Sequence, residues 1–507
     1  MRSVTQSMSY KSRLSHLERD GERSLTQQLV DLIAAAIESG ELAADEKLPP
    51  TRELAELAGV NHLTAVRAYR RLRELGLVSA HVGRGTFVRG AARAPARSVP
   101  DSIAWQRYAL PESDETYGDR VLAEMYTHSV TEGLIPLSVG YPSARIFPTD
   151  GFRAAADAIL RSEPERAMQY SDVRGTPELA EQIAALSAAR GAPEDGDDIV
   201  VTTGAAQALT VAMRAILRPG DVAACEDPSF VSVLRAIRSA GATVKAVPVD
   251  EDGLDVDALE ALLARTEIKL LALQPRLHNP TGRDLSPERR ARLLDLIRRH
   301  GFFVVEDGIY ADLRFEGEAV PSLRAEAPAH VVYCDSFSKV IGGGLRAGWV
   351  AASGPVLDRI VSEKRADDIH TPTLTQLAMA RYLASGAYPE QAERARRAYL
   401  HGHEVLLGAI DEHLGSIASY MTPLGGGHVW VTLDAPISER ELVDEAGRQG
   451  VAYAPGGALR AERQRDLSMR LSYCYAAPDE LAEGVRRLAA AVRVARDRPA
   501  RRAAVPI

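Results

Sequence analysis

The chain has 507 residues, of which 46% are hydrophobic and 26% charged, and it carries a formal net charge of -8. These values are typical of a globular protein with several domains, and they exclude a largely disordered chain, a collagen-like chain and a disulfide scaffold. No apolar run reaches the roughly 18 residues that indicate a membrane-spanning helix.

The N-terminus and the cysteines indicate the cellular compartment. The first residues are polar and contain no apolar core of a secretory signal. The three cysteines lie far apart without metal-ligand spacing, which is typical of reduced thiols. We therefore expect a cytoplasmic protein with no metal site and no membrane association.

Positive charge is concentrated between residues 61 and 89, where six arginines stand against one glutamate. A basic patch on an otherwise acidic protein is typical of local contact with nucleic acid. A solvated helix face gives the same count of charges. The predicted elements of this region therefore decide between the two interpretations.

The first 90 residues have the pattern of a small helical domain. Residues 1–22 are polar and aperiodic, and we interpret them as a tail. Apolar residues at helical spacing then predict a first helix over residues 25–37. Thr51 is placed to cap a short second helix that ends at Gly59.

Asn61 is placed to cap a third helix, whose inward residues are predicted to be Val66, Tyr69, Leu72 and Leu75. Two short runs of β-forming residues follow around a glycine-containing turn, which indicates a hairpin. Three helices and a hairpin predict a winged helix-turn-helix domain over residues 23–90.

In this motif the third helix enters the major groove, and the hairpin, or wing, contacts phosphates or the minor groove. The predicted contacts with double-stranded operator DNA are Arg52, His62, Thr64, Arg67, Arg71, Arg84 and Thr86. Residues 48–88 strongly resemble the DNA-binding domain of the GntR family, and the wing sequence Gly-x-Gly-Thr-Phe-Val is the most specific part. A winged helix that binds only protein is the alternative.

Residues 91–133 begin with alanine, arginine and proline, a composition typical of a linker. From residue 134 to 494, short apolar β runs alternate with helical patterns, and residues 495–507 are predicted to be a tail. This alternation predicts an α/β domain whose mainly parallel sheet is covered on both faces. Ligands of such sheets bind at the carboxyl ends of the strands.

Chemically useful residues follow several of these runs. Lys339 comes after a buried strand and two serines, and a lysine so placed can form a Schiff base with an aldehyde cofactor. Asp307 would meet the pyridinium nitrogen and keep the ring protonated. The start of the helix at Gly204, Ala205 and Ala206 would bind a phosphate. Ser336, Ser338 and Arg346 would contact the same phosphate. The ring would be contacted by Asn279 and Tyr310 at its hydroxyl and by Phe230 on its face.

Four motifs occur in order: Asn-Pro-Thr-Gly at 279–282, Asp-x-x-Tyr at 307–310, Ser-x-Ser-Lys at 336–339 and Gly-x-Arg-x-Gly at 344–348. Together they resemble fold-type I pyridoxal-phosphate (PLP) enzymes of the aspartate aminotransferase class. The resemblance covers residues 134–494 and implies a smaller C-terminal α+β subdomain.

The same resemblance implies further roles. Arg470 would grip the α-carboxylate of a substrate or effector, beside Asn279, and Tyr170 would reach the cofactor phosphate of the neighbouring subunit. A surface ion pair is the alternative for Arg470. Ala205 departs from the pattern of many aminotransferases because it offers no hydroxyl, so phosphate contacts there involve only the backbone.

A GntR-type head joined to an aminotransferase-like body is similar to the MocR/GabR regulators. The resemblance implies a homodimer, an operator with paired half-sites, and an amino acid or amine as effector. We therefore expect a PLP-dependent transcription regulator. The alternative is a working aminotransferase with an accessory DNA-binding head, because the set of predicted catalytic residues, Lys339, Asp307 and Tyr310, is complete.

Overall fold

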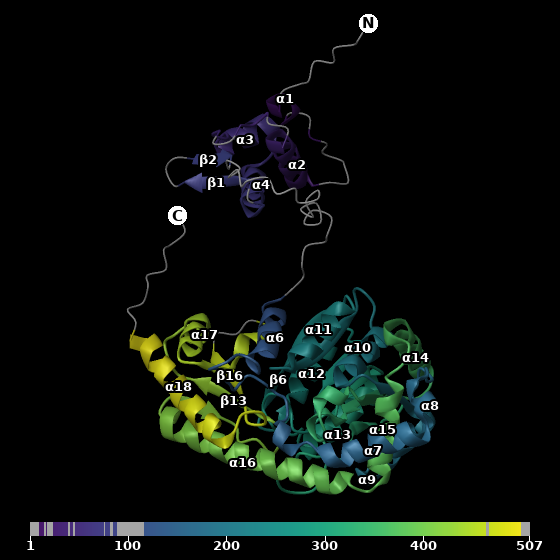
Figure 1. Ribbon diagram of the computed structural model, residues 1–507. Helices are drawn as coiled ribbons and strands as arrows, with labels where there is room; N and C mark the ends of the chain where they lie inside the picture. The colour runs from purple at the N-terminus through teal and green to yellow at the C-terminus, as the bar shows by residue number, and fades with distance from the viewer. Residues whose placement is uncertain are drawn as a thin grey trace. The chain divides into compact units, whose positions relative to one another are not determined.

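The computed structural model describes residues 10–14, 17, 24–38, 41–43, 46–75, 77–81, 85–88, 116–462 and 466–497. The chain divides into two compact units, residues 1–112 and 113–507 (Figure 1). We call them the head and the body and describe each by itself. Among the described residues, no helix has both the length and the apolar composition needed to cross a bilayer.

The head consists of helices around a small apolar core, followed by an antiparallel hairpin that pairs Val78 with Val88. Its elements are α1 (Tyr10–Leu14), α2 (Leu25–Glu38), α3 (Thr51–Ala58), α4 (His62–Glu74), β1 (Val78–His81) and β2 (Gly85–Val88). This arrangement is the predicted winged helix-turn-helix. Residues 1–22 are not wholly a tail, because Tyr10 and Leu14 of α1 are buried in the core of the head.

Helix α4 begins as predicted, since the Asn61 side chain accepts a hydrogen bond from the Thr64 backbone N–H at 2.8 Å. Its inward face differs in detail: Val66 is only half-buried, whereas the smaller Ala65 and Ala68 are buried. Thr51 does not cap α3. It is the first residue of that helix, and its hydroxyl lies 3.1 Å from His62 Nε2.

The body is built on an eight-stranded sheet in the order β4-β11-β10-β9-β8-β5-β6-β7. Strands β4, β10, β9, β8, β5 and β6 share one direction, and β11 and the edge strand β7 run in the opposite direction. The strands are β4 (Ile199–Thr202), β5 (Val222–Asp227), β6 (Thr243–Asp250), β7 (Gly253–Leu254), β8 (Leu270–Leu273), β9 (Phe303–Asp307), β10 (Val331–Ser336) and β11 (Gly348–Ala351).

Successive residues of a strand point to opposite sides of the sheet. Helices cover both sides. Ala223 and Cys225 of β5 belong to the apolar cluster under α10 (Ala205–Ile216), α11 (Val231–Ser239) and α14 (Pro355–Asp368). Ala224, between them, belongs to the cluster under α12 (Val256–Leu263) and α13 (Pro287–His300). The prediction of a mainly parallel, doubly covered sheet is confirmed.

A smaller antiparallel sheet, β12-β13-β16-β15, forms the C-terminal part of the body. In Figure 1, α17 and α18 lie beside β13 and β16, and the helical layer continues along α16. The strands are β12 (Ala418–Tyr420), β13 (His428–Leu433), β15 (Ala454–Pro455) and β16 (Leu467–Ser472), and β14 (Val451–Ala452) pairs with β3 (Ile135–Pro136). The remaining helices are α7 (Thr149–Ser162), α8 (Pro164–Met168), α9 (Pro177–Ala189), α15 (Thr373–Ala384), α16 (Tyr388–Leu414), α17 (Glu439–Arg448) and α18 (Pro478–Asp497).

Part of the predicted linker, residues 91–133, is a helix of the body. Helix α6 (Tyr117–His128) begins with a capping box between Thr116 and Asp119. Its residues Val121, Leu122 and Met125 are buried against the body, so this segment packs and does not serve as a linker. Residues 91–115 of the predicted linker lie outside the described part of the chain. At the other end, α18 extends into the predicted tail as far as Asp497.

Candidate functional site

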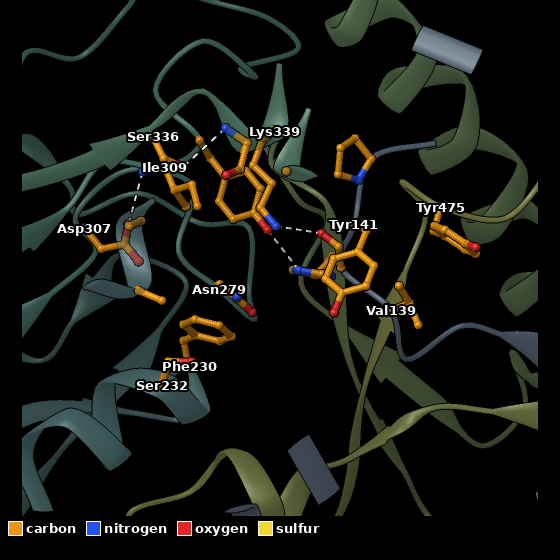
Figure 2. Close-up of a pocket in the computed structure, with 18 of the residues that line it drawn as sticks. Val139, Tyr141, Phe230, Ser232, Asn279, Asp307, Ile309, Ser336, Lys339 and Tyr475 are labelled. Carbon is orange, nitrogen blue, oxygen red and sulfur yellow. Dashed lines mark hydrogen bonds between the residues drawn. The ribbon is translucent and has the colours of Figure 1, made fainter. Parts of the chain in front are cut away.

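A cavity of about 550 Å³ lies within the body, where the carboxyl ends of the large sheet meet the smaller sheet. Asp307 ends β9 and Ser336 ends β10, whereas Arg470 comes from β16. In the view of Figure 2, Asp307 and Tyr475 lie on opposite sides of Lys339. The cavity therefore has two sides with different chemistry.

Lys339 lies in a single 3₁₀ turn, Phe337–Lys339, directly after β10. Its Nζ donates a hydrogen bond to the Gly140 carbonyl at 2.7 Å, and it lies 5.9 Å from the centre of the Tyr310 ring. Burial lowers the pKa of the Lys339 amine. A lower pKa leaves more of the amine neutral, which is the nucleophilic form.

Asp307 is a buried carboxyl with few hydrogen bonds. Burial raises its pKa to about 7, the nearby Asp335 and Glu306 act in the same direction, and the Ile309 backbone N–H donates to it at 3.1 Å. A carboxyl in this state is stabilised by an adjacent cation. The protonated nitrogen of a pyridine ring is such a cation.

The start of α10 forms a cradle with Arg346. Gly204, with φ of 98°, precedes α10, and a Cβ at this position would lie 3.0 Å from Arg346 Nη2. Arg346 donates to the backbone carbonyls of Thr203 and Gly343, and no carboxylate of the described residues forms an ion pair with it. The backbone of Ala205 and Ala206 also lines the cavity, as do Ser336 and Ser338. Free helix N–H groups, hydroxyls and an unpaired guanidinium suit a phosphate.

Asn279, Tyr310 and Phe230 also line the cavity. The Tyr310 hydroxyl lies 3.0 Å from His428 Nε2, and burial holds the pKa of His428 well below its usual value. The sequence analysis did not identify His428, which follows a run of three glycines that could have drawn attention to it. A neutral imidazole that accepts a hydrogen bond from a buried phenol fixes the direction of the phenol hydroxyl.

Arg470 is buried, with an exposed fraction of 2%, and none of the described acidic side chains pairs with it. Its guanidinium donates to the Ser138 carbonyl at 2.9 Å and to Asn279 Oδ1 at 3.2 Å, while its Nε has no partner. Such a cation is costly unless a negative charge joins it. The structure thus disfavours the surface ion pair considered from sequence. It leaves a place for an external carboxylate.

Tyr170 lies outside this cavity. Its side chain is 74% exposed, and its ring meets the edge of His370 at 5.2 Å. Tyr170 is therefore not part of the lining of the cavity in its own chain. Its predicted contact with a neighbouring subunit stays a prediction.

On the head, the predicted DNA contacts fall into three groups. Arg52, His62 and Arg67 are exposed on α3 and α4, whereas the other described ones, Thr64, Arg71 and Thr86, are half-buried. The Thr64 hydroxyl donates to Asn61 Oδ1 at 3.0 Å, so the helix cap uses it. Arg84 lies outside the described residues. Leu63, beside His62 at the start of α4, is 65% exposed.

Comparison with known proteins places both parts of the chain. The family model for aminotransferase class I and II matches residues 133–488, and the model for bacterial regulatory proteins of the gntR family matches residues 25–88. The 2-aminoadipate transaminase of Thermus thermophilus is 35% identical over 71% of this chain and 90% of its own length. The probable rhizopine catabolism regulatory protein MocR of Rhizobium meliloti is 27% identical over 94% of this chain and 95% of its own length.

The body also resembles solved structures. One is the α-aminoadipate aminotransferase LysN of Thermus thermophilus, complexed with N-(5'-phosphopyridoxyl)-L-leucine. It is 32% identical with a TM-score of 0.70, and the match covers 77% of this chain and 98% of that one. The two transaminases match 71% and 77% of this chain, whereas the similarity to MocR covers 94% of it and so includes both head and body.

Proposed function

Because this chain belongs to the aminotransferase class I and II family and joins to it a GntR-family head, as MocR-type regulators do, we propose that it regulates transcription in response to an amino compound bound in the body. The observation that carries the proposal is Arg470, a buried cation that lines the same cavity as Lys339 and has no acidic partner in the described part of the chain. A cavity so equipped recognises a molecule that has both a carboxylate and an amine.

PLP is the cofactor of this family, and the residues of the cavity fit it. Arg346 and the start of α10 would hold its phosphate, and Asp307 its ring nitrogen. When bound, PLP supplies an aldehyde that condenses reversibly with a primary amine, releasing water, and a ring that withdraws electrons. Lys339 Nζ would hold the cofactor, and the Gly140 carbonyl receives this amine when it is free.

Tyr310 and His428 would orient the polar edge of the ring, and Arg470 would orient the carboxylate of the effector. The head would read DNA with α4, where Arg67 is exposed and near the N-terminal end. A homodimer would present two heads to two half-sites. Because dimerisation links the two heads, binding of the first would raise the effective concentration of the second.

The competing function is transamination, because every group needed for it lies in the cavity. To separate the two, the full-length PLP-loaded protein is titrated onto labelled DNA from upstream of its own gene, with and without each standard amino acid. Amino-group transfer to a keto acid is measured in parallel. We expect sequence-specific binding whose affinity changes with one amino acid. Efficient transfer without sequence-specific binding would favour the enzyme.

A further inference from the structure

One wall of the cavity is formed by helix α6, which none of the sequence motifs predicted to lie there. Helix α6 contributes Leu122 and Met125 to the lining of the cavity. Both are buried in a cluster that also contains Trp430 of β13 and Ala454 of β15. Trp430 and Ala454 are the residues directly opposite Arg470 in the smaller sheet. Since directly opposite residues share one face of a sheet, α6 packs on the side of the cavity that holds Arg470.

Hydrogen bonds fix the C-terminal end of α6 to the same side. His128 Nδ1 lies 2.8 Å from the Ser138 hydroxyl, and the Ser138 carbonyl accepts from Arg470. The hydroxyl of Tyr475, which lines the cavity, donates to the Ser129 carbonyl at 3.1 Å. Leu122 and Met125 therefore belong to a wall held in place beside the carboxylate position.

The proposed function accounts for every charged side chain that this chain contributes to the described lining. Among its described residues, only Asp307, Lys339, Arg346 and Arg470 carry a formal charge. The first three face the cofactor, and Arg470 takes the α-carboxylate. The cavity is otherwise lined mainly by apolar and aromatic side chains, among them Val139, Tyr141, Phe147 and Ile309. A charged effector side chain would lose water there without gaining an opposite charge, at a cost that an apolar side chain avoids.

We propose that the effector is an α-amino acid with an uncharged, apolar side chain, and that Leu122 and Met125 of α6 contact that side chain and determine specificity. This inference rests on the proposed function, since it assumes that an amino acid binds beside Arg470. It also places the selecting residues on the first described helix after the head.

The test is the change in the absorbance spectrum of the PLP-loaded protein as it is titrated with L-leucine, L-glutamate or L-lysine. We expect L-leucine to act at a concentration at least tenfold lower than the other two. Met125→Arg should remove this preference and favour L-glutamate, because the added guanidinium supplies the missing opposite charge. Leu122→Ala, a milder change, should weaken the response to L-leucine more than the response to L-alanine.

The matched control is Ala123→Arg, which adds the same side chain to an exposed position of the same helix. It should keep the wild-type preference, and thermal unfolding of each variant provides the check on its folding. A wild-type response to L-glutamate or L-lysine stronger than to L-leucine would overturn the inference and leave the proposed function intact. The same preference in Met125→Arg and wild type would also overturn it. No spectral or operator response to any amino acid would overturn both.

Discussion

Replacing Arg470 by methionine tests whether this buried cation serves a ligand or the fold. The substitution keeps an unbranched side chain of similar length and removes the charge. Among the residues that the structure describes, Arg470 has two neutral oxygen partners and no carboxylate. Removal of the cation therefore leaves no buried charge unpaired. Each neutral oxygen that loses its hydrogen-bond donor lowers the free energy of unfolding by about 1–3 kcal/mol at most. Loss of the desolvated charge offsets part of that cost.

Effector binding should respond much more strongly. Truncating one partner of a buried, hydrogen-bonded charge pair costs about 2–5 kcal/mol, which corresponds to roughly 30- to 4,000-fold in affinity. We expect Arg470→Met to raise the effector concentration that gives half of the spectral change by such a factor. Its Tm without effector should fall less than that of a variant that leaves buried carboxylates unpaired.

Arg324→Met is the matched control. Arg324 is equally buried, but it donates to Glu194 at 2.7 Å and to Asp198 at 3.2 Å and does not line the cavity. Its removal leaves carboxylates unpaired, which costs about 3–5 kcal/mol. Thermal unfolding and effector titration of both variants complete the assay. A large loss of stability in Arg470→Met with unchanged effector affinity would refute the reasoning.

Four further predictions concern the cofactor, the DNA contact and pH. Borohydride reduction of the PLP-loaded protein, followed by peptide mapping, should place the pyridoxyl group on Lys339, and a label on another lysine would contradict the site. Lys339→Ala should still bind operator DNA but lose the effector-dependent change in operator affinity, measured by fluorescence anisotropy. An equal change in wild type and Lys339→Ala would show that effector binding without Schiff-base exchange carries the signal. Arg67→Ala should lose about 1–3 kcal/mol of binding to its own operator, with relaxed specificity at one position, whereas Arg84→Ala should weaken all sequences alike and reduce the salt dependence. Undiminished operator binding by Arg67→Ala in a gel shift would show that α4 is wrongly placed. In the cofactor-free protein, burial raises the pKa of Asp307 from its ordinary value of 3.8 to about 7. The folded state therefore keeps a proton that the unfolded chain has released between these values, and stability falls as pH rises through this window. Asp307→Asn should reduce that fall in urea unfolding, and an unchanged slope would count against the assignment.

The sequence by itself determined the two-part architecture and the side of the cavity that would hold the cofactor. Residues such as Asp307 and Lys339 could be placed because each follows a short apolar strand. In a parallel sheet all such strands end at one edge, so that sequence order alone brings their next residues together. In the same way, Asn61 and the residues after it marked the start of α4, because capping is a local interaction.

Only the tertiary structure decided what surrounds the effector position. The apolar spacing of α6 shows that this helix packs, but not against which surface, so Leu122 and Met125 gave no signal of their own. His428 meets Tyr310 from a strand 118 residues away. The isolation of Arg470 from acidic side chains is likewise visible only in three dimensions, because ion pairing depends on distances between residues far apart in the chain. Local patterns fix elements and their ends, whereas the partners of a buried charge follow from packing.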